Sequence, residues 1–236
     1  MPRALDPLSE TVAVIDFETT GLPAGAGGRA TEIAAVLVRD GRIVDHYASL
    51  MRSGARVPPF IVQLTGISDA MLESAPPSDR VMQEVAAFVG HCPLVAHNAA
   101  FDRSFWQAEL RRIDHESARP FACTMLLSRR LYPESPNHRL GTLAVLHGLP
   151  SAGRAHRALA DAQTTARLLL QMQRDLRQRY AAGDVSHELL TRLQRAARGG
   201  LAACVAAHES RIPAPSGMAR PVRETPPRQV VSGGLR

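Results

Sequence analysis

The sequence contains no lysine, and all 28 of its basic residues are arginines. So complete a bias indicates genome composition, and the number of arginines therefore carries no functional argument. Cysteine is also scarce, and its three copies lie too far apart for a CxxC zinc ribbon and argue against a disulfide framework. No apolar run reaches the roughly 18 residues of a membrane span, and the first residues lack the apolar stretch of a signal peptide. We therefore expect a soluble cytoplasmic protein with no membrane contact.

The chain of 236 residues is long enough for one sizeable domain with an appendage or for two small domains, and a core of that size needs no disulfide or structural metal to fold. Its formal net charge of +6 and its pI of about 10.2 suggest a polyanionic partner. The charge is unevenly placed, because residues 1–170 hold as many acidic residues as arginines. The excess lies in residues 171–236, which we expect to add salt-sensitive affinity for nucleic acid.

Short runs rich in apolar and β-branched residues predict five strands. They lie at 11–15, 32–38, 42–50, 93–96 and about 121–123. The second and third are joined by Asp40-Gly41, a hairpin signal, so they should be antiparallel. Helical segments are expected at 79–89, 99–113, 125–131, from about 140 and at 157–179, with short helical turns at 58–74. A meander followed by alternating strands and helices predicts an α/β fold with a mixed sheet flanked by helices.

The composition changes towards the C-terminus. Residues 184–208 can form one amphipathic helix, which Gly199-Gly200 weakens. Residues 212–236 contain five prolines and few apolar side chains, so we expect a disordered tail there. The expected organisation is a catalytic domain at 1–180, a helical appendage at 181–211 and a basic tail rich in proline and glycine at 212–236.

Two carboxylates stand at the end of the first predicted strand. Asp16 and Glu18 are two residues apart, so in a strand their side chains point to the same face. Adjacent buried anions are unfavourable unless a cation compensates them, and Mg²⁺ or Mn²⁺ with oxygen ligands is the obvious compensator. Alternatively, one carboxylate caps the following turn and the other is solvated. The pair alone leaves both interpretations open.

Two further motifs place acidic residues near helix starts. An apolar strand leads through His97 and Asn98 into a helix, and Asp102 lies one turn into it, near the strand end where α/β sheets usually bind ligands. His156 lies at or just before the start of a later helix that contains Asp161, where a histidine can take a proton from water near neutral pH. Taken alone, each acid is better explained by the helix dipole. The occurrence of four acids and a histidine in this order shifts the comparison from the helix-dipole explanation towards a shared role in catalysis.

In this order the motifs resemble the histidine branch of the DEDD 3′→5′ exonucleases, which includes the proofreading epsilon subunit of bacterial DNA polymerase III and stand-alone relatives. The three motifs are Asp16-Phe-Glu18-Thr-Thr-Gly-Leu, His97-Asn-Ala-Ala-Phe-Asp102 and His156-Arg-Ala-Leu-Ala-Asp161. Leu64-Thr65-Gly66-Ile67 resembles the family's nucleotide-contacting turn, and Arg139-Leu-Gly-Thr-Leu143 its helix before the third motif. The resemblance covers about residues 11–172. It implies a ribonuclease H-like fold with about five strands, the second of them antiparallel.

The resemblance implies phosphodiester hydrolysis with two divalent cations, Mg²⁺ or Mn²⁺, about 3.5–4 Å apart. The acids would bind these ions, with Asp16 bridging both, Glu18 and Asp161 on the water-activating ion, and Asp102 on the second ion through water. His156 would be the general base. The tyrosine branch of the superfamily has a tyrosine four residues before the last aspartate. That position here is Arg157, so the histidine branch is the better match.

The resemblance also implies contacts with the substrate. Thr19 and the adjoining backbone, with Gly21 and Leu22, would meet the 3′-OH of the terminal nucleotide. Leu64 and Thr65 would pack on or wedge beside the last bases, since stacking tolerates any base sequence.

The second motif adds three expected substrate residues. Phe101 would also pack beside the last bases, with plain core packing as the alternative. His97 and Asn98 would contact phosphate or order their loop.

We expect a metal-dependent 3′→5′ exonuclease that acts on single-stranded or frayed 3′ ends of DNA and releases 5′-mononucleotides in proofreading or repair. The first motif, Asp-Phe-Glu-Thr-Thr-Gly, is closer to the DNA-polymerase-associated type than to the Asp-Leu-Glu-Met-Thr-Gly of oligoribonuclease. One alternative is an exoribonuclease of the ribonuclease T or oligoribonuclease type, which would read the 2′-OH. Another is a dedicated replicase subunit that binds a DNA polymerase subunit through residues 184–236, although no clear glutamine-led clamp-binding peptide follows the core. A non-enzymatic binding module fits the five intact residues least.

Overall fold

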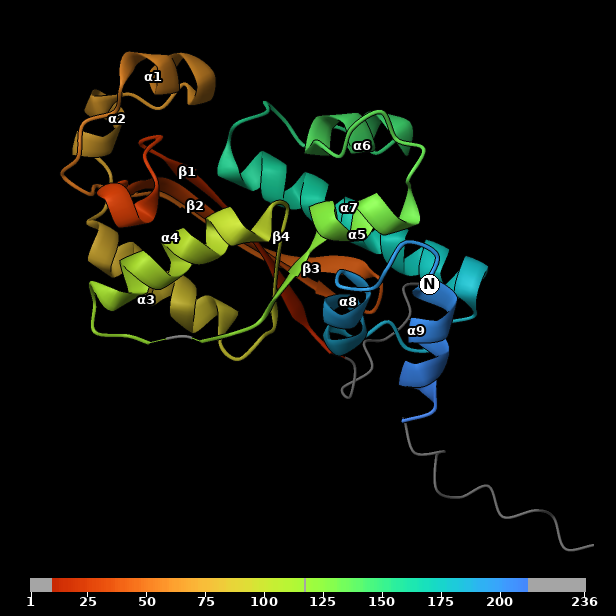
Figure 1. Ribbon diagram of the computed structural model, residues 1–236. Helices are drawn as coiled ribbons and strands as arrows, with labels where there is room; N and C mark the ends of the chain where they lie inside the picture. Colours follow the sequence, from red (N-terminus) through yellow and green to blue (C-terminus); the bar gives the residue numbers. More distant parts are fainter. Residues whose placement is uncertain (1–9, 117, 212–236) are drawn as a thin grey trace, which may run out of the picture.

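The computed structural model describes residues 10–116 and 118–211 (Figure 1). Its strands are β1 (Val12–Thr19), β2 (Ala30–Arg39), β3 (Arg42–Leu50), β4 (Leu94–Ala96) and β5 (Phe121–Cys123). They form one five-stranded sheet in the order β3-β2-β1-β4-β5. β2 is antiparallel to β1 and β3, whereas β4 runs parallel to β1 and β5. This confirms the predicted mixed sheet with its antiparallel second strand.

The turn between β2 and β3 confirms the predicted hairpin. Asp40 and Gly41 both have positive φ, at 52° and 72°, as a two-residue type I′ turn requires. β1 extends further than its apolar run indicated. It stays paired with β2 through Glu18, because backbone hydrogen bonds continue through polar residues wherever the neighbouring strand supplies partners. Asp16 and Glu18 therefore lie inside the strand.

Different helices cover the two faces of the sheet (Figure 1). One face is covered by α3 (Ser78–Val89) and α4 (Ala99–Arg111), the other by α7 (Ala158–Tyr180) with α5 (Thr124–Leu131) and α6 (Leu140–Leu146) nearby. Along β1, Ile15 packs in the apolar core under α3 and α4, whereas Val12 and Val14 pack with α7. Because side chains alternate along a strand, Asp16 and Glu18 belong to the α7 face.

The helical elements nearest the first motif are short. A 3₁₀ helix, η1 (Ala24–Ala26), follows the loop after β1 and lies against α4. Between β3 and α3, α1 (Pro59–Thr65) and α2 (Asp69–Glu73) enclose a small apolar cluster centred on Ile61 and Ile67. Among the described residues, none of the helices combines the length and apolarity needed to cross a membrane.

The prediction of a single helix at 184–208 is wrong, because the structure has two helices there. The first, α8 (His187–Leu193), is followed by Gln194, whose side chain pairs with the outer edge of β5. Its oxygen accepts from the amide of Cys123 at 2.6 Å, and its nitrogen donates to the carbonyl of Phe121 at 3.1 Å. The second, α9 (Leu201–Glu209), begins after Gly199, whose φ is +79°.

The two C-terminal helices share the main apolar core. Their buried side chains belong to the same cluster as Val12 and Val14 of β1; they are Leu189, Leu190, Leu193, Leu201 and Val205. Residues 181–211, expected as an appendage, therefore pack onto the sheet and α7. The tail expected at 212–236 lies outside the described residues.

Candidate active site

The predicted site lies where β1 runs past the end of β4. β4 ends at Ala96, and its register with β1 pairs Ala13 with Leu94 and Val14 with Val95. Further along β1, the amide of Phe17 donates to Oδ1 of Asp102 at 3.2 Å. Asp102 lies in the first turn of α4 and is only 2% exposed. This hydrogen bond joins the second motif to the first.

The turn between β4 and α4 aims Asp102 at β1. Asn98 adopts the left-handed conformation, with φ of 66°, which asparagine tolerates better than most residues, and α4 begins directly after it. His97 fixes the turn from the other side: Nδ1 lies 2.9 Å from Oγ1 of Thr124 and Nε2 lies 3.0 Å from the carbonyl oxygen of His138. Burial lowers the pKa of His97 to about 4, so the ring is neutral at pH 7. These contacts favour the loop-ordering role over the phosphate contact for His97, whereas Asn98 is exposed.

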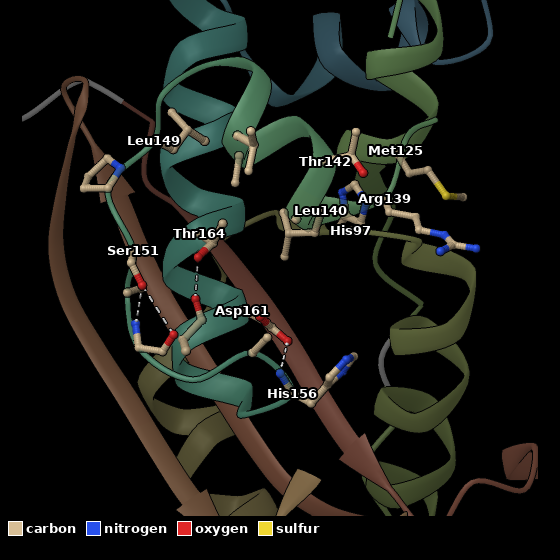
Figure 2. A pocket seen from close by; sticks show the side chains of 18 of the residues that line it. His97, Met125, Arg139, Leu140, Thr142, Leu149, Ser151, His156, Asp161 and Thr164 are labelled. Carbon is tan, nitrogen blue, oxygen red and sulfur yellow. Dashed lines mark hydrogen bonds between the residues drawn. The ribbon is translucent and has the colours of Figure 1, made fainter. Parts of the chain in front are cut away.

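The third motif brings His156 beside Asp161 at the start of α7. His156 has a positive φ of 59°, and its backbone amide donates to Oδ2 of Asp161 at 3.0 Å. The imidazole is exposed and points away from α7 (Figure 2). One possible ligand atom from each of Glu18, His156 and Asp161 lies within 4.8 Å of the others. The first and third motifs therefore meet at one point.

Burial and mutual repulsion raise the pKa values of the carboxyl groups in this cluster. Burial first, then the charges of Asp161 and Glu32, raise the pKa of Glu18 to about 8, although Arg157 opposes the shift. The pKa of Asp102 is also raised to about 8, mainly by burial, and its backbone hydrogen bonds oppose the shift. At pH 7 and in the absence of a cation, the carboxyl groups of Glu18 and Asp102 therefore favour the protonated form.

Asp16 and Asp161 show the same trend. Burial raises the pKa of Asp16 well above its ordinary value, and the surrounding carboxylates raise it further. Burial also raises the pKa of Asp161, although the hydrogen bond from His156 opposes the shift. A bound cation would relieve this repulsion, and carboxylate oxygens are the ligands that Mg²⁺ and Mn²⁺ prefer. The donor set therefore fits divalent cations of this type.

Sequence reasoning assigned no role to two charged residues beside this cluster. Glu32 lies opposite Glu18 in the register of β1 and β2 and is 5% exposed. Its carboxylate accepts two hydrogen bonds from the guanidinium of Arg157, at 3.0 and 2.8 Å. The available signal was that Glu32 is the only acidic residue in the run 32–38, which is otherwise apolar.

Three of the predicted substrate residues lie at the end of β1 and in the loop after it. Thr19 is buried, and its hydroxyl accepts from the amide of Gly21 at 3.2 Å. Gly21 has φ of +88°, and a Cβ at this position would lie only 2.8 Å from Cδ1 of Ile61. Glycine therefore permits the close approach of this loop to α1. The next residue, Leu22, is 55% exposed.

Other large apolar side chains are exposed on the neighbouring elements. Leu64 is 46% exposed and Phe101 is 39% exposed. Phe60, which the sequence did not single out, is 64% exposed and lies on α1 close to Gly21. Phe101 also packs on Phe105, with 5.0 Å between ring centroids. The Phe101 ring thus combines a core contact with an exposed face.

Thr65 lacks this exposure. It is 1% exposed, and its hydroxyl donates to the carbonyl of Ile61 at 2.9 Å and accepts from the amide of Ile67 at 3.0 Å. The side chain therefore orders the turn after α1. This placement corrects the expectation that Thr65 packs beside a base, because both hydrogen-bonding functions of its hydroxyl are used inside the protein.

A cavity of about 740 Å³ adjoins His156 and Asp161 (Figure 2). It lies between α6 and the first turns of α7, and residues 148–153, 155 and 156 form part of its wall. Its lining is mostly apolar, with Leu140 among the apolar residues and Arg139 as a positive charge. The acidic cluster therefore borders a space large enough for part of a ligand.

Residues 13–169 match the protein family RNase_T, described as Exonuclease, and this segment contains all the predicted site residues. Exonuclease X, solved with 5′-overhanging duplex DNA, is 30% identical with a TM-score of 0.62, covering 78% of this chain and 99% of that chain. The nuclease domain of 3'hExo, a DEDDh family member bound to rAMP, shares the fold at 22% identity and a TM-score of 0.60, covering 72% of this chain and 94% of that chain. This chain belongs to the DEDD 3′→5′ exonuclease family.

Two further relatives are much longer than the segment that they share with this chain. The PolC-type DNA polymerase III of Halalkalibacterium halodurans is 38% identical over 173 residues, which are 73% of this chain and 12% of the relative. The 3′-5′ exonuclease DinG of Staphylococcus aureus is 35% identical over 161 residues, which are 68% of this chain and 18% of the relative. The chain thus spans less than a fifth of these two relatives. DEDD exonucleases use divalent metal ions, in agreement with the donor set described above.

Proposed function

We propose that this chain is a metal-dependent exonuclease that hydrolyses the 3′-terminal phosphodiester of single-stranded or frayed DNA and releases 5′-mononucleotides. The meeting of the three motifs carries the proposal. Possible ligand atoms of Glu18, His156 and Asp161 lie within 4.8 Å of one another, and Asp102 is hydrogen-bonded to β1 beside them. Carboxylates and a histidine at one point meet the two needs of phosphodiester hydrolysis, which are charge neutralisation and a proton acceptor.

Four carboxylates would hold two divalent cations, Mg²⁺ or Mn²⁺. They are Asp16, Glu18, Asp102 and Asp161. When bound, the cations would neutralise the phosphate, activate water and stabilise the leaving 3′ oxygen. The raised pKa values support this assignment, because carboxyl groups that are buried and also repel one another when ionised gain most from a shared cation.

His156 would accept the proton of the water that attacks the phosphorus. Its imidazole is exposed beside Glu18 and Asp161, and the hydrogen bond from its backbone amide to Asp161 fixes the loop that carries it. A neutral imidazole has a ring nitrogen that can accept a proton, which suits a general base. Loss of the ring would therefore remove the proton acceptor and leave the four carboxylates in place.

The exposed apolar residues near the cluster would receive the terminal bases. Leu22, Leu64 and Phe101 would pack on base faces, and Phe60 extends the same exposed apolar set. Such contacts tolerate any base sequence, because every base has an aromatic face. Asn98, exposed at the turn before α4, would contact phosphate.

DNA is favoured as the substrate. The first motif is closer to the DNA-polymerase-associated type than to that of oligoribonuclease, and the relatives include a PolC-type DNA polymerase III and an exonuclease X solved with duplex DNA. The rAMP bound to 3'hExo makes an exoribonuclease the second candidate. We favour a stand-alone or accessory repair enzyme over a dedicated polymerase subunit. Stable co-purification with a DNA polymerase subunit would reverse that preference.

The test compares labelled single-stranded DNA and RNA of the same sequence, with Mg²⁺, with Mn²⁺ and with EDTA. The wild type should release 5′-mononucleotides from DNA only when a cation is present. D16A and D161A should release none, and H156A should be slower by about 10²–10⁴-fold. D45A is the control, because Asp45 is an exposed carboxylate on β3 whose side chain accepts from the adjacent His46 amide. Undiminished cleavage by D16A would overturn the assignment, and faster degradation of RNA would favour the exoribonuclease.

A further inference from the structure

Arg157 occupies the chain position at which the tyrosine branch of this superfamily carries its tyrosine, yet its side chain does not join the acidic cluster. Its Nε donates to Oε2 of Glu32 at 3.0 Å, and one terminal nitrogen donates to Oε1 at 2.8 Å. Two parallel bonds of this kind fix the guanidinium in direction as well as in distance. Arg157 is therefore clamped to β2.

Glu32 also holds the start of α7. Oε2 of Glu32 accepts from the backbone amide of Ala158, the first residue of the helix, at 3.0 Å. Arg157 itself provides no side-chain cap to α7, so a carboxylate from a neighbouring strand satisfies this free amide. Glu32 is 5% exposed within a strand that is buried along most of its length. The anchor is thus a rigid part of the sheet.

The residue before Arg157 needs such an anchor. His156 has φ of 59°, a conformation that non-glycine residues seldom adopt and keep only when the surroundings hold them. Two contacts hold it from opposite sides. Its own amide is bonded to Asp161 inside the cluster, and the next residue is bonded to Glu32 outside it.

We infer that the Glu32–Arg157 pair is a positioning device that holds the His156 imidazole over the acidic cluster. The inference rests on the proposed function, in which His156 is the general base. Arg157 acts through His156 and makes no contact with the substrate. Without the pair, the backbone of His156 relaxes toward an ordinary conformation and its ring leaves the attacking water, while the carboxylates and the apolar base contacts stay in place.

The first measurement separates kcat from KM for R157Q. Because a displacement of about 1 Å can slow a reaction by about 10²-fold, we expect kcat to fall by about 10–100-fold. KM for a short DNA oligonucleotide should change by less than about twofold, since the base contacts lie on other elements. R157K should be intermediate, because lysine keeps the charge but cannot form the two-bonded contact. An unchanged kcat for R157Q overturns the inference.

The second measurement is a double-mutant cycle with H156A, which separates positioning from general damage to the fold. If Arg157 acts through His156, R157Q should slow the H156A enzyme by less than about threefold, although it slows the wild type by about 10–100-fold. Equal losses in both backgrounds overturn the inference in favour of a merely structural role.

A matched control is available in a second ion pair. Arg29 binds Glu109 with the same two-bonded geometry, at 2.9 and 3.0 Å, and Glu109 is 2% exposed. Any effect of R29Q on kcat should be the same in the wild-type and H156A backgrounds. If R29Q instead loses its effect in the H156A background, the cycle does not report on His156 and the inference fails.

A further variant guards against loss of folding. Removing Arg157 alone leaves Glu32 buried and unpaired, which destabilises a protein more than removing both partners. E32Q/R157Q removes both charges, keeps an acceptor for the Ala158 amide and should show the same His156-dependent loss of kcat. Full activity of D16A would overturn the proposed nuclease function. Loss of activity in D16A and H156A with a normal kcat in E32Q/R157Q would overturn only the positioning role.

Discussion

Glu18 and Glu32 stand opposite each other on β1 and β2, and the fold treats their carboxylates in opposite ways. Glu32 is neutralised by Arg157 and by the amide of Ala158. Glu18 instead faces Asp161 and His156, and its pKa is raised to about 8. One cross-strand pair therefore holds a carboxylate that anchors α7 and a carboxylate that, under the proposed function, would bind a cation.

The first prediction concerns pH and metal removal. The carboxyl groups of Glu18 and Asp102 have ordinary pKa values of 4.5 and 3.8 but about 8 in the fold. The folded state thus keeps protons that the unfolded state has lost, and the free energy of unfolding falls as pH rises through 8. In EDTA, urea denaturation should show lower stability at pH 8.5 than at pH 6.5. Saturating Mg²⁺ should remove this fall.

The lower limit of that pH window is set by His97. Its pKa is lowered to about 4, so below pH 6.5 the unfolded state gains a proton that the folded state lacks, and stability falls as pH falls. Above pH 6.5, His97 is neutral in the folded and the unfolded state and no longer makes the free energy of unfolding depend on pH. E18Q should make the EDTA profile shallower between pH 6.5 and 8.5 without abolishing the slope, because Asp102 keeps its raised pKa. A wild-type stability in EDTA that rises over this window would contradict the prediction.

The second prediction separates the two roles of Asp102. Its Oδ1 accepts from the buried amide of Phe17, a bond that asparagine can keep and alanine cannot. Both D102N and D102A should be inactive. In EDTA, D102A should be less stable than D102N by about 1–3 kcal/mol, the cost of a buried donor without a partner. Urea denaturation measures the difference, and equal stabilities would mean that the Phe17 bond contributes nothing.

The third prediction compares three glycines near the first motif. Gly21 and Gly27 both have φ of +88°, but a Cβ would clash with Ile61 only at Gly21, and Gly25 lacks both constraints. G25A should be neutral, and G27A should cost about 1–2 kcal/mol of backbone strain without raising KM. G21A should carry the same backbone strain and should also displace α1, because the new Cβ clashes with Ile61. KM for DNA should therefore rise. Similar KM values for G21A and G27A would show that the approach to α1 is unimportant.

The fourth prediction concerns truncation. Residues 212–236 hold four arginines and one glutamate, so a chain that ends at Arg211 should bind DNA more weakly and with a shallower dependence on salt. Its kcat on short oligonucleotides should be unchanged. A chain that ends at Gly183 should fail to fold, because it lacks the buried side chains of α8 and α9. An unchanged salt dependence of DNA binding in the chain that ends at Arg211 would contradict the role of the arginines. A stable fold in the chain that ends at Gly183 would contradict the need for α8 and α9.

The sequence by itself determined which residues are candidates for the chemistry and in what order they follow one another along the chain. The acids could be found from their local positions and their order along the chain. Asp16 and Glu18 end an apolar run, and Asp102 and Asp161 lie near helix starts. Periodicity and turn residues also predicted the five strands and the hairpin at Asp40-Gly41. These signals are local, because they depend on residues that are neighbours in the same element.

Only the tertiary structure decided which groups are paired. Glu32 and Arg157 are far apart in the chain, and no pattern within either element shows that they meet. The same holds for Gln194, whose bonds to β5 accompany the break between α8 and α9 that the apolar pattern did not reveal. Local periodicity reports which face of an element is apolar. The partner that compensates a buried charge or a free amide comes from another element, so it is fixed only when the elements pack.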